Sequence, residues 1–170
     1  MKILNLGSLN LDRTYRVEHF VQAGETIPAI GYGTSPGGKG LNQSVALARA
    51  GAEVCHLGAV GSDGGELLRI LEGAGADTRF VQTLSGPSGH AIIQVTPEGE
   101  NCIIIFGGTN RQIIAEMVDA ALRSFGPGDL LLLQNETSQG EYTIREAKRR
   151  GLRIAFNPSP ISQELFRYPF

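Results

Sequence analysis

The sequence predicts an α/β fold, with a mostly parallel central sheet flanked by helices and a second, smaller sheet. Short apolar segments typical of strands alternate along the chain with segments of helical periodicity. Residues 129–133 form a continuous apolar run, as expected of a strand buried on both faces of a parallel sheet. The chain has 170 residues, which suits one domain and is enough to bury a core.

The first predicted strand spans residues 2–7, and Asn10 and Asp12 follow it closely. In open α/β sheets, ligands bind just beyond the carboxyl ends of the strands, so these two polar side chains are candidates for a binding site. Both residue types also favour Asx turns, and this stretch alone supports the two interpretations equally.

A small, separate sheet is expected from two pairs of short strands. Residues 14–20 and 26–32 form one pair, joined through Gln22-Ala23-Gly24, and residues 90–96 and 101–107 form a hairpin. Strands this short and mixed in polarity suit an exposed sheet rather than a core. Their unpaired edges favour association with a second copy of the chain.

The centre of the predicted site is the stretch Pro36-Gly37-Gly38-Lys39-Gly40-Leu41-Asn42. Its glycines leave the backbone open to close approach by a ligand. An alanine-rich helix is predicted over residues 41–50 and is closed by Gly51. A helix start offers unpaired N–H groups and the positive end of the helix dipole, which suits an anion or a ligand rich in hydroxyl groups.

Two nucleotide-binding motifs are rejected. Residues 33–39 fit the G-x-x-x-x-G-K of a P-loop, but Gly40 stands where that motif needs Ser or Thr to hold Mg²⁺. Pro36 also lies inside the would-be phosphate cradle, where it has no N–H to donate. A Rossmann-type enzyme is disfavoured because Gly7-Ser8-Leu9-Asn10 is not the required G-x-G-x-x-G.

The rest of the chain continues the alternation of strands and helices. Ser62 or Asp63 is expected to cap a helix that runs to about Gly73, and Gly73-Ala74-Gly75-Ala76-Asp77 reads as the end of that helix, leading into a strand. The apolar run 129–133 leads to Glu136, which is either a ligand-binding group or a cap of the next helix. The other expected elements are strands at residues 53–61 and 152–156, helices at 113–125 and 141–150, and a helix that starts within 164–170.

The charge and the cysteines of the sequence indicate which binding partners and which cellular compartment to expect. A formal charge of −2 gives no electrostatic footprint for nucleic acid or a membrane surface. Cys55 and Cys102 lie in apolar segments, lack metal-ligand spacing, and are predicted to be buried thiols of a reducing compartment. With no secretory n-region and no long apolar span in the sequence, we expect a cytoplasmic protein.

Five separated motifs together resemble the ribokinase-like (PfkB) carbohydrate kinases, and ribokinase most closely. The order and spacing of these motifs match that family over essentially the whole chain. They are Gly7-Ser8-Leu9-Asn10-Leu11-Asp12, Gly37-Gly38-Lys39-Gly40-Leu41-Asn42-Gln43-Ser44, the pair Gly51 and Gly61, Glu136, and Asn157-Pro158-Ser159-Pro160.

The resemblance implies a ribokinase-like fold in which residues 1–170 are the N-terminal part of one domain and the C-terminal half is absent. Strands from about 14–32 and 88–107 would form a lid over the sugar, which some members also use for dimer contacts. The resemblance also implies the sugar-binding residues, which are Asn10, Asp12, Gly38, Lys39, Asn42 and Glu136.

The implied activity is transfer of the ATP γ-phosphoryl group to a sugar hydroxyl, with ribose favoured and other pentoses, hexoses and nucleosides left open. The family's Asn-x-x-Glu motif near Mg²⁺ and its Gly-Ala-Gly-Asp segment, which holds the catalytic base, are missing from this sequence. We therefore expect no catalytic, ATP, Mg²⁺ or monovalent-cation site in this chain, and no catalysis by it alone. Asp63, Asp77 and Asp129 have no motif support as a base. The alternative is a non-catalytic sugar-binding or lid-dimer fragment of such a kinase.

Overall fold

A computed structural model describes residues 1–169 of the chain, Glu164 by its backbone alone. It contains a five-stranded parallel sheet in the order β5-β4-β1-β8-β9 and a four-stranded sheet in the order β3-β2-β6-β7. The strands are β1 Lys2–Leu6, β2 Asn10–Arg16, β3 Gly31–Gly37, β4 Glu53–Val60, β5 Asp77–Thr83, β6 Gly89–Val95, β7 Asn101–Phe106, β8 Leu130–Gln134 and β9 Arg153–Asn157. The helices are α1 Lys39–Arg49, α2 Gly65–Ala74, α3 Ala115–Leu122 and α4 Gly140–Arg149, with 3₁₀ helices at Gly108–Arg111 and Gln163–Arg167.

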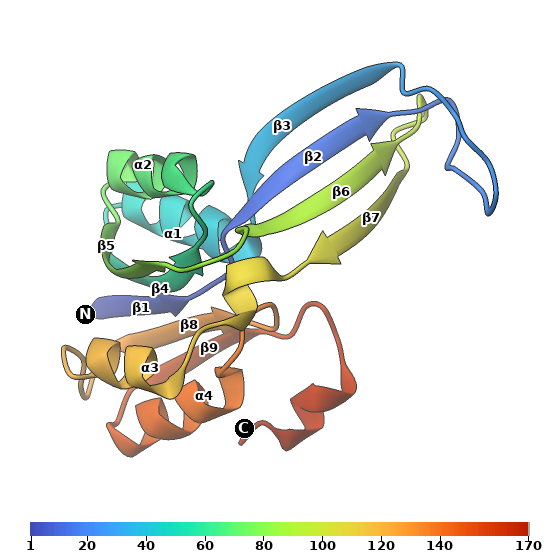
Figure 1. The fold of residues 1–170 in the computed structure, drawn as a ribbon. Coiled ribbons are helices and arrows are strands. Elements are labelled where there is room, and N and C mark those ends of the chain that lie inside the picture. Colours follow the sequence, from blue (N-terminus) through green and yellow to red (C-terminus); the bar gives the residue numbers. More distant parts are fainter. Residues whose placement is uncertain (170) are drawn as a thin grey trace.

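The five-stranded sheet is covered on both faces, which confirms the α/β prediction. Helices α1 and α2 pack on one face and α3 and α4 on the other (Figure 1). Alternate residues of β1 serve the two layers, since Ile3 joins the core under α1 and α2 while Leu4 and Leu6 join the core under α3 and α4. No helix in residues 1–169 combines the length and the apolar character needed to cross a membrane.

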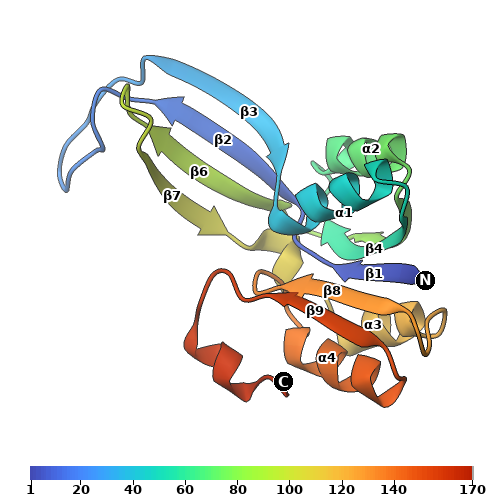
Figure 2. The ribbon, with the colours of Figure 1, turned by 180° about the vertical axis from the view of Figure 1, so that it is seen from behind.

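The four-stranded sheet projects away from this body, and all four of its strands join the body at the same end (Figures 1 and 2). Strand β2 pairs parallel to β6 and antiparallel to β3, and β6 and β7 form the predicted hairpin. The hairpin prediction was close, but the other pair was displaced, because β2 and β3 lie at Asn10–Arg16 and Gly31–Gly37 instead of 14–20 and 26–32.

The displacement has a physical reason. The segment Gly31–Gly37 is rich in glycine and looks like a loop, yet its backbone pairs with β2 from Asn10↔Gly37 to Arg16↔Gly31. It is an edge strand, where Pro36 is tolerated because one side of the strand needs no partner. Asn10 and Asp12 therefore lie on a strand of the second sheet and not in a turn after β1.

Three smaller predictions were wrong. Asp63 does not cap α2, whose N-cap is Gly64 without a side-chain bond; its carboxylate instead accepts hydrogen bonds from the N–H and hydroxyl of Ser88, at 2.9 and 2.7 Å. Cys55 is buried as expected, but Cys102 is exposed, because its apolar segment belongs to the projecting sheet. The segment predicted to start a helix within 164–170 is the 3₁₀ helix Gln163–Arg167, and Phe170 lies outside the described residues.

Candidate functional site

The first part of the candidate site is the base of strand β2. Asn10 is its first residue and is 5% exposed, while Asp12 is half-buried and belongs to the face that also carries Ala91 of β6. The carbonyl side of the Asn10 amide is occupied, because Asn110 Nδ2 donates to Asn10 Oδ1 at 2.8 Å. The amide nitrogen is therefore the group that Asn10 can offer to a ligand.

The glycine loop supplies the second part. Gly38 has φ = 97°, a left-handed conformation that glycine adopts without strain, and this turn lets β3 pass directly into α1. Gly40 lies against the link between β1 and β2, and a Cβ on Gly40 would overlap the backbone of Gly7 and Ser8. Helix α1 starts at Lys39, two residues earlier than predicted, so Lys39 lies in its first turn and Asn42 is exposed about one turn later.

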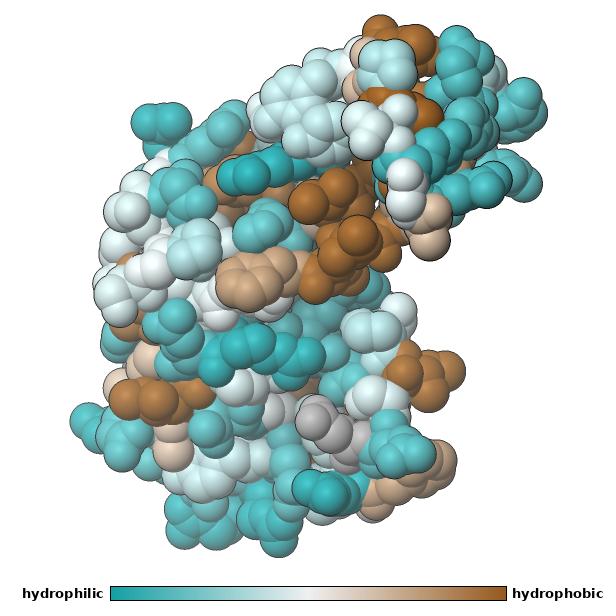
Figure 3. All heavy atoms as spheres, turned by 45° about the vertical axis from the view of Figure 1, so that its right-hand side comes forward, coloured by the Kyte–Doolittle hydropathy of each residue, from teal (hydrophilic) through white to brown (hydrophobic). Residues whose placement is uncertain are grey.

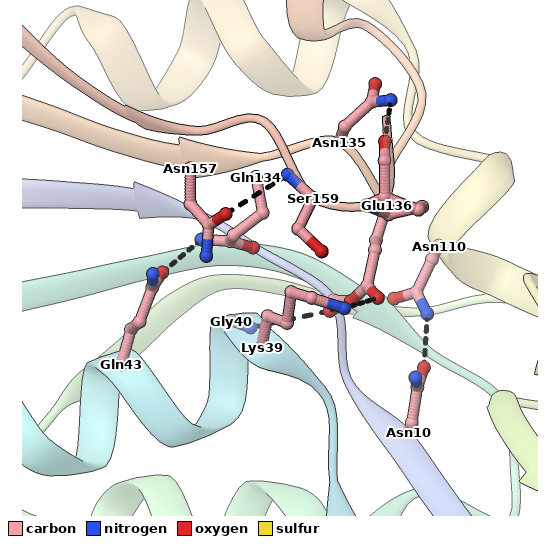
Figure 4. Close-up of polar contacts among 12 residues, drawn as sticks. Asn10, Lys39, Gly40, Gln43, Asn110, Gln134, Asn135, Glu136, Asn157 and Ser159 are labelled. Atoms are coloured by element: carbon pink, nitrogen blue, oxygen red, sulfur yellow. Dashed lines mark hydrogen bonds and ion pairs between the residues drawn. The ribbon is translucent and has the colours of Figure 1, made fainter. Parts of the chain in front are cut away.

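Glu136 supplies the third part, just after β8, and is 8% exposed. Its Oε2 accepts a hydrogen bond from Ser8 Oγ at 2.5 Å, and its Oε1 forms an ion pair with Lys39 Nζ (Figure 4). The contact with Ser8 ties the end of β8 to the link between the two sheets. Each oxygen of this carboxylate keeps further lone pairs for a ligand hydroxyl.

These parts meet in one cavity of about 200 Å³. All six residues predicted to bind a sugar line it: Asn10, Asp12, Gly38, Lys39, Asn42 and Glu136. The apolar part of its lining comes from strands β6 and β7 of the projecting sheet, through Ala91, Ile93, Ile103 and Ile105. The cavity thus offers donors, acceptors and an apolar surface to one small ligand.

The charge balance in the cavity is set by Asp12, Glu136 and Lys39. Partial burial raises the pKa of Asp12, the nearby Glu136 carboxylate raises it further, and the Lys39 ammonium opposes both effects. Burial takes the Asp12 carboxylate partly out of water, so ligand hydroxyls that donate to it would replace hydrogen bonds to solvent.

The sequence did not single out Asn110, the residue that orients Asn10. Asn110 is 1% exposed, its Oδ1 accepts from the N–H of Leu9 at 3.0 Å, and its Nδ2 donates to Asn10. It lies in the 3₁₀ helix after β7, about 100 positions from Asn10, and its only local signal is its place after the glycine pair Gly107-Gly108.

A larger cavity of about 490 Å³ lies at the start of α4, between Arg111 and Tyr168. It contains none of the six predicted residues. Arg111, Arg167 and an Arg145–Glu141 ion pair at 2.6 Å supply its charged groups, and Glu141 is the single carboxylate among them. We therefore take the smaller cavity as the candidate site, since it gathers convergent polar groups that are not all engaged with one another. Within residues 1–169, no group of three or more His, Cys, Asp and Glu side chains is arranged to hold a metal ion.

Comparison with known proteins agrees with this geometry. The sequence pattern described as pfkB family carbohydrate kinase matches residues 1–149. The ribokinase of Haemophilus influenzae is 36% identical over 168 residues, which cover 94% of this chain and 55% of that protein. The ribokinase of Schizosaccharomyces pombe is 34% identical over 182 aligned positions, covering 99% of this chain and 57% of that protein. The chain thus spans about half the length of the curated relatives it matches.

Solved structures show the same relationship. The ribokinase of Cryptococcus neoformans in complex with ADP matches with a TM-score of 0.84 and 34% identity, over 99% of this chain and 55% of that one. The ribokinase of Arabidopsis thaliana complexed with ribose and ATP matches with a TM-score of 0.79 and 27% identity, over 93% of this chain and 53% of that one.

Proposed function

Because this chain belongs to the pfkB family of carbohydrate kinases, we propose that it is the sugar-binding part of an ATP-dependent kinase that phosphorylates a sugar hydroxyl, with ribose favoured. The observation that carries this proposal is the convergence of the six predicted residues on one cavity. A cavity of about 200 Å³ has room for a small ligand such as a monosaccharide.

Each residue has a role in holding the sugar. Asp12 and Glu136 accept hydrogen bonds from hydroxyl groups, and the amide nitrogen of Asn10 donates one. Gly38, Lys39 and Asn42 hold the side of the ring nearest helix α1. The apolar side chains around Ile103 offer a nonpolar surface to the carbon face of the sugar ring.

ATP and Mg²⁺, with a monovalent cation, would supply the phosphoryl group and neutralise its charge. Among the side chains that the structure describes, no three His, Cys, Asp or Glu residues are grouped to hold a metal ion. We assign these groups no residues of this chain, and no catalytic base, because the family motifs that would hold them are not in this sequence. Its own contribution is to bind and orient the acceptor sugar.

The alternative proposal is a non-catalytic fragment that binds sugar or pairs through the projecting sheet, which we interpret as a lid. It is favoured by the coverage of only 55% of the Haemophilus influenzae relative. The lid exposes apolar side chains on both faces of its sheet, Ile103 and Ile105 on one face and Ile104 and Phe106 on the other. Apolar surface gathers on the lid in Figure 3, and it supports a homodimer through the lid. The free thiols Cys55 and Cys102 support a cytoplasmic location.

Isothermal titration of the chain with ribose tests the proposed function. We expect saturable binding that is weakened by Asp12→Ala and kept in Glu98→Gln, which removes a carboxylate from the exposed hairpin turn of the lid. Circular dichroism confirms that each variant is folded. A folded chain that takes up no ribose, fructose or adenosine would refute a sugar-binding role for this cavity.

A further inference from the structure

Four polar side chains lie inside the body directly behind the glycine loop. Asn5, Ser44 and His56 are fully buried, and Gln134 is 1% exposed. Asn5 is in the middle of β1, on the face that packs against α1, where an apolar side chain is expected. Burying four such groups costs free energy unless they form hydrogen bonds, so their hydrogen-bond partners must be identified.

The hydrogen bonds join these residues into one chain with a defined direction. The Gly7 carbonyl can only accept, so His56 Nε2, at 3.1 Å, carries the proton. His56 Nδ1 then accepts from the Ser44 hydroxyl at 2.8 Å. The Ser44 oxygen in turn accepts from Asn5 Nδ2 at 2.8 Å, and Asn5 Oδ1 accepts from Gln134 Nε2 at 3.0 Å. Every bond fits a neutral histidine in the Nε2–H form.

Two members of this relay hold the backbone of the candidate site. His56, at one end, donates to the carbonyl of Gly7, and Asn5, within the relay, also donates to the carbonyl of Gly40 at 3.0 Å. Gly7 and Gly40 contact each other so closely that a Cβ on Gly7 would overlap the Cα of Gly40. The relay therefore ties together, from behind, the two backbone segments that carry the binding residues.

The contact between the Gly7 and Gly40 segments also fixes the positions of groups in the candidate site. The N–H of Leu41 donates to the Ser8 carbonyl at 3.0 Å, and the Ser8 hydroxyl donates to Glu136 at 2.5 Å. Lys39 precedes Gly40 and pairs with the same carboxylate. If the two segments separate, Lys39 and Glu136 are no longer held at a fixed distance from each other.

We propose that Asn5, Ser44, His56 and Gln134 form a positioning relay for the candidate site, acting through the backbone of Gly7 and Gly40. The sugar-binding aspect of this proposal rests on the proposed function. The clamping of the loop does not, since it is a property of the unliganded chain. None of the four side chains lines the cavity, so they are positioning residues and not ligand contacts.

The test removes the middle of the relay with Ser44→Ala. Alanine favours the helix and is small enough to fit, while Asn5 and His56 lose their shared partner. Thr143→Val is the matched control, because it also deletes one fully buried hydroxyl, which donates to the Gln139 carbonyl at 2.7 Å in α4. Hydrogen exchange of the Leu41 amide reports on the loop contact without any ligand, and titration with ribose reports on binding.

In Ser44→Ala we expect the Leu41 amide to exchange at least about tenfold faster, relative to the amides of α3, and ribose to bind about tenfold more weakly. Thr143→Val should change neither ratio. If Ser44→Ala speeds exchange equally throughout the chain, the relay is ordinary core packing and the proposal fails. If the unmodified chain binds no ribose, the proposed function fails, while Leu41 exchange still decides the relay.

A second measurement needs no variant. The ¹⁵N shifts of the His56 ring in the unmodified chain give its tautomer. We expect a protonated Nε2 and an unprotonated Nδ1 at neutral pH. A protonated Nδ1 would break the direction of the relay and overturn the proposal, even if Ser44→Ala does not fold.

Discussion

Lys39 and Glu136 lie 97 positions apart in the sequence and form an ion pair at the edge of the candidate cavity. Glu136 is 8% exposed, while about a third of the Lys39 side chain (34%) is open to solvent. The pair therefore joins a buried carboxylate to a partly solvated ammonium group. It connects the first turn of α1 to the end of β8, the two parts of the body that frame the site.

Removing Lys39 should leave the Glu136 carboxylate buried and short of one donor. We expect Lys39→Met to lower the free energy of unfolding by about 1–3 kcal/mol, discounted from the cost of a fully buried pair because Lys39 is partly solvated. Urea denaturation measures this value. In a double-mutant cycle, Lys39→Met with Glu136→Gln should cost less than the sum of the single changes. Additive costs would show that the two groups do not interact.

Asp12 is expected to be a main anchor for the sugar. Asp12→Asn keeps the shape of the side chain but removes a charged acceptor, so sugar binding should weaken by roughly 1–3 kcal/mol. Titration calorimetry of the chain with ribose measures the change, with Glu98→Gln as the charge-matched control. An unchanged affinity in Asp12→Asn would remove Asp12 from the set of sugar ligands.

Stability should fall in mild acid because His56 is buried in its neutral form. Burial lowers its pKa from 6.5 to about 4, and the bond to the Gly7 carbonyl only partly opposes this. Between these pH values the unfolded chain binds more protons, so the free energy of unfolding rises with pH. The stabilisation is complete above pH 6.5 and is lost as the pH falls towards about 4, by an amount on the order of 3 kcal/mol.

Urea denaturation from pH 4 to 7 tests this dependence. His56→Gln keeps a donor for Gly7 and has no proton to gain, so its profile should be flatter by the contribution of His56. Parallel profiles for the two proteins would show that His56 is not buried as a neutral ring.

The lid is expected to pair with a second copy of the chain. Ile103 and Ile105 are 48% and 50% exposed on the same face of the lid sheet, and apolar surface of this extent favours association. Sedimentation velocity should therefore show a dimer that Ile103→Asp dissociates. Ile114→Asp is the control, because Ile114 is 51% exposed but lies just before α3, outside the lid. A monomer at all concentrations would contradict the pairing.

The chain by itself should show no ATP-dependent phosphorylation of sugars. Loss of one preorganised donor at a developing charge costs about 10²–10³-fold in rate. The family segment Gly-Ala-Gly-Asp, which supplies both the catalytic base and the anion hole, is not in this sequence. A coupled assay of ADP release with ribose, fructose and adenosine measures the activity. Turnover that rises with sugar and vanishes in Asp12→Ala would place the catalytic groups within this chain.

Local sequence patterns predicted the body of the fold, and the resemblance to the PfkB kinases implied which residues form the site. Strand β8 was recognisable because a strand buried on both faces needs a continuous apolar run, and α1 because a glycine loop precedes an alanine-rich segment. The six proposed binding residues lie in short motifs, and the structure brings them to one cavity. Whether they bind sugar remains a prediction.

What the sequence could not predict depends on contacts between distant segments. Strand β3 has the composition of a loop and becomes a strand only because β2 pairs with its backbone. Cys102 stands beside an isoleucine run that resembles a core strand, yet that strand is exposed. The relay through Ser44 and His56 was not predicted for the same reason. No local sequence pattern indicates that Asn5, in β1, forms a hydrogen bond with Ser44.

The attachment of the projecting sheet has a mechanical consequence. Its four strands meet the body at one end, so the sheet is a cantilever with its root at the cavity (Figures 1 and 2). Asn10 and Asp12 belong to the cantilever, while Lys39 and Glu136 belong to the body. A ligand that contacts both sets would link the projecting sheet to the body at this attachment, close to where the strands leave the body and far from the free ends of β2 and β6.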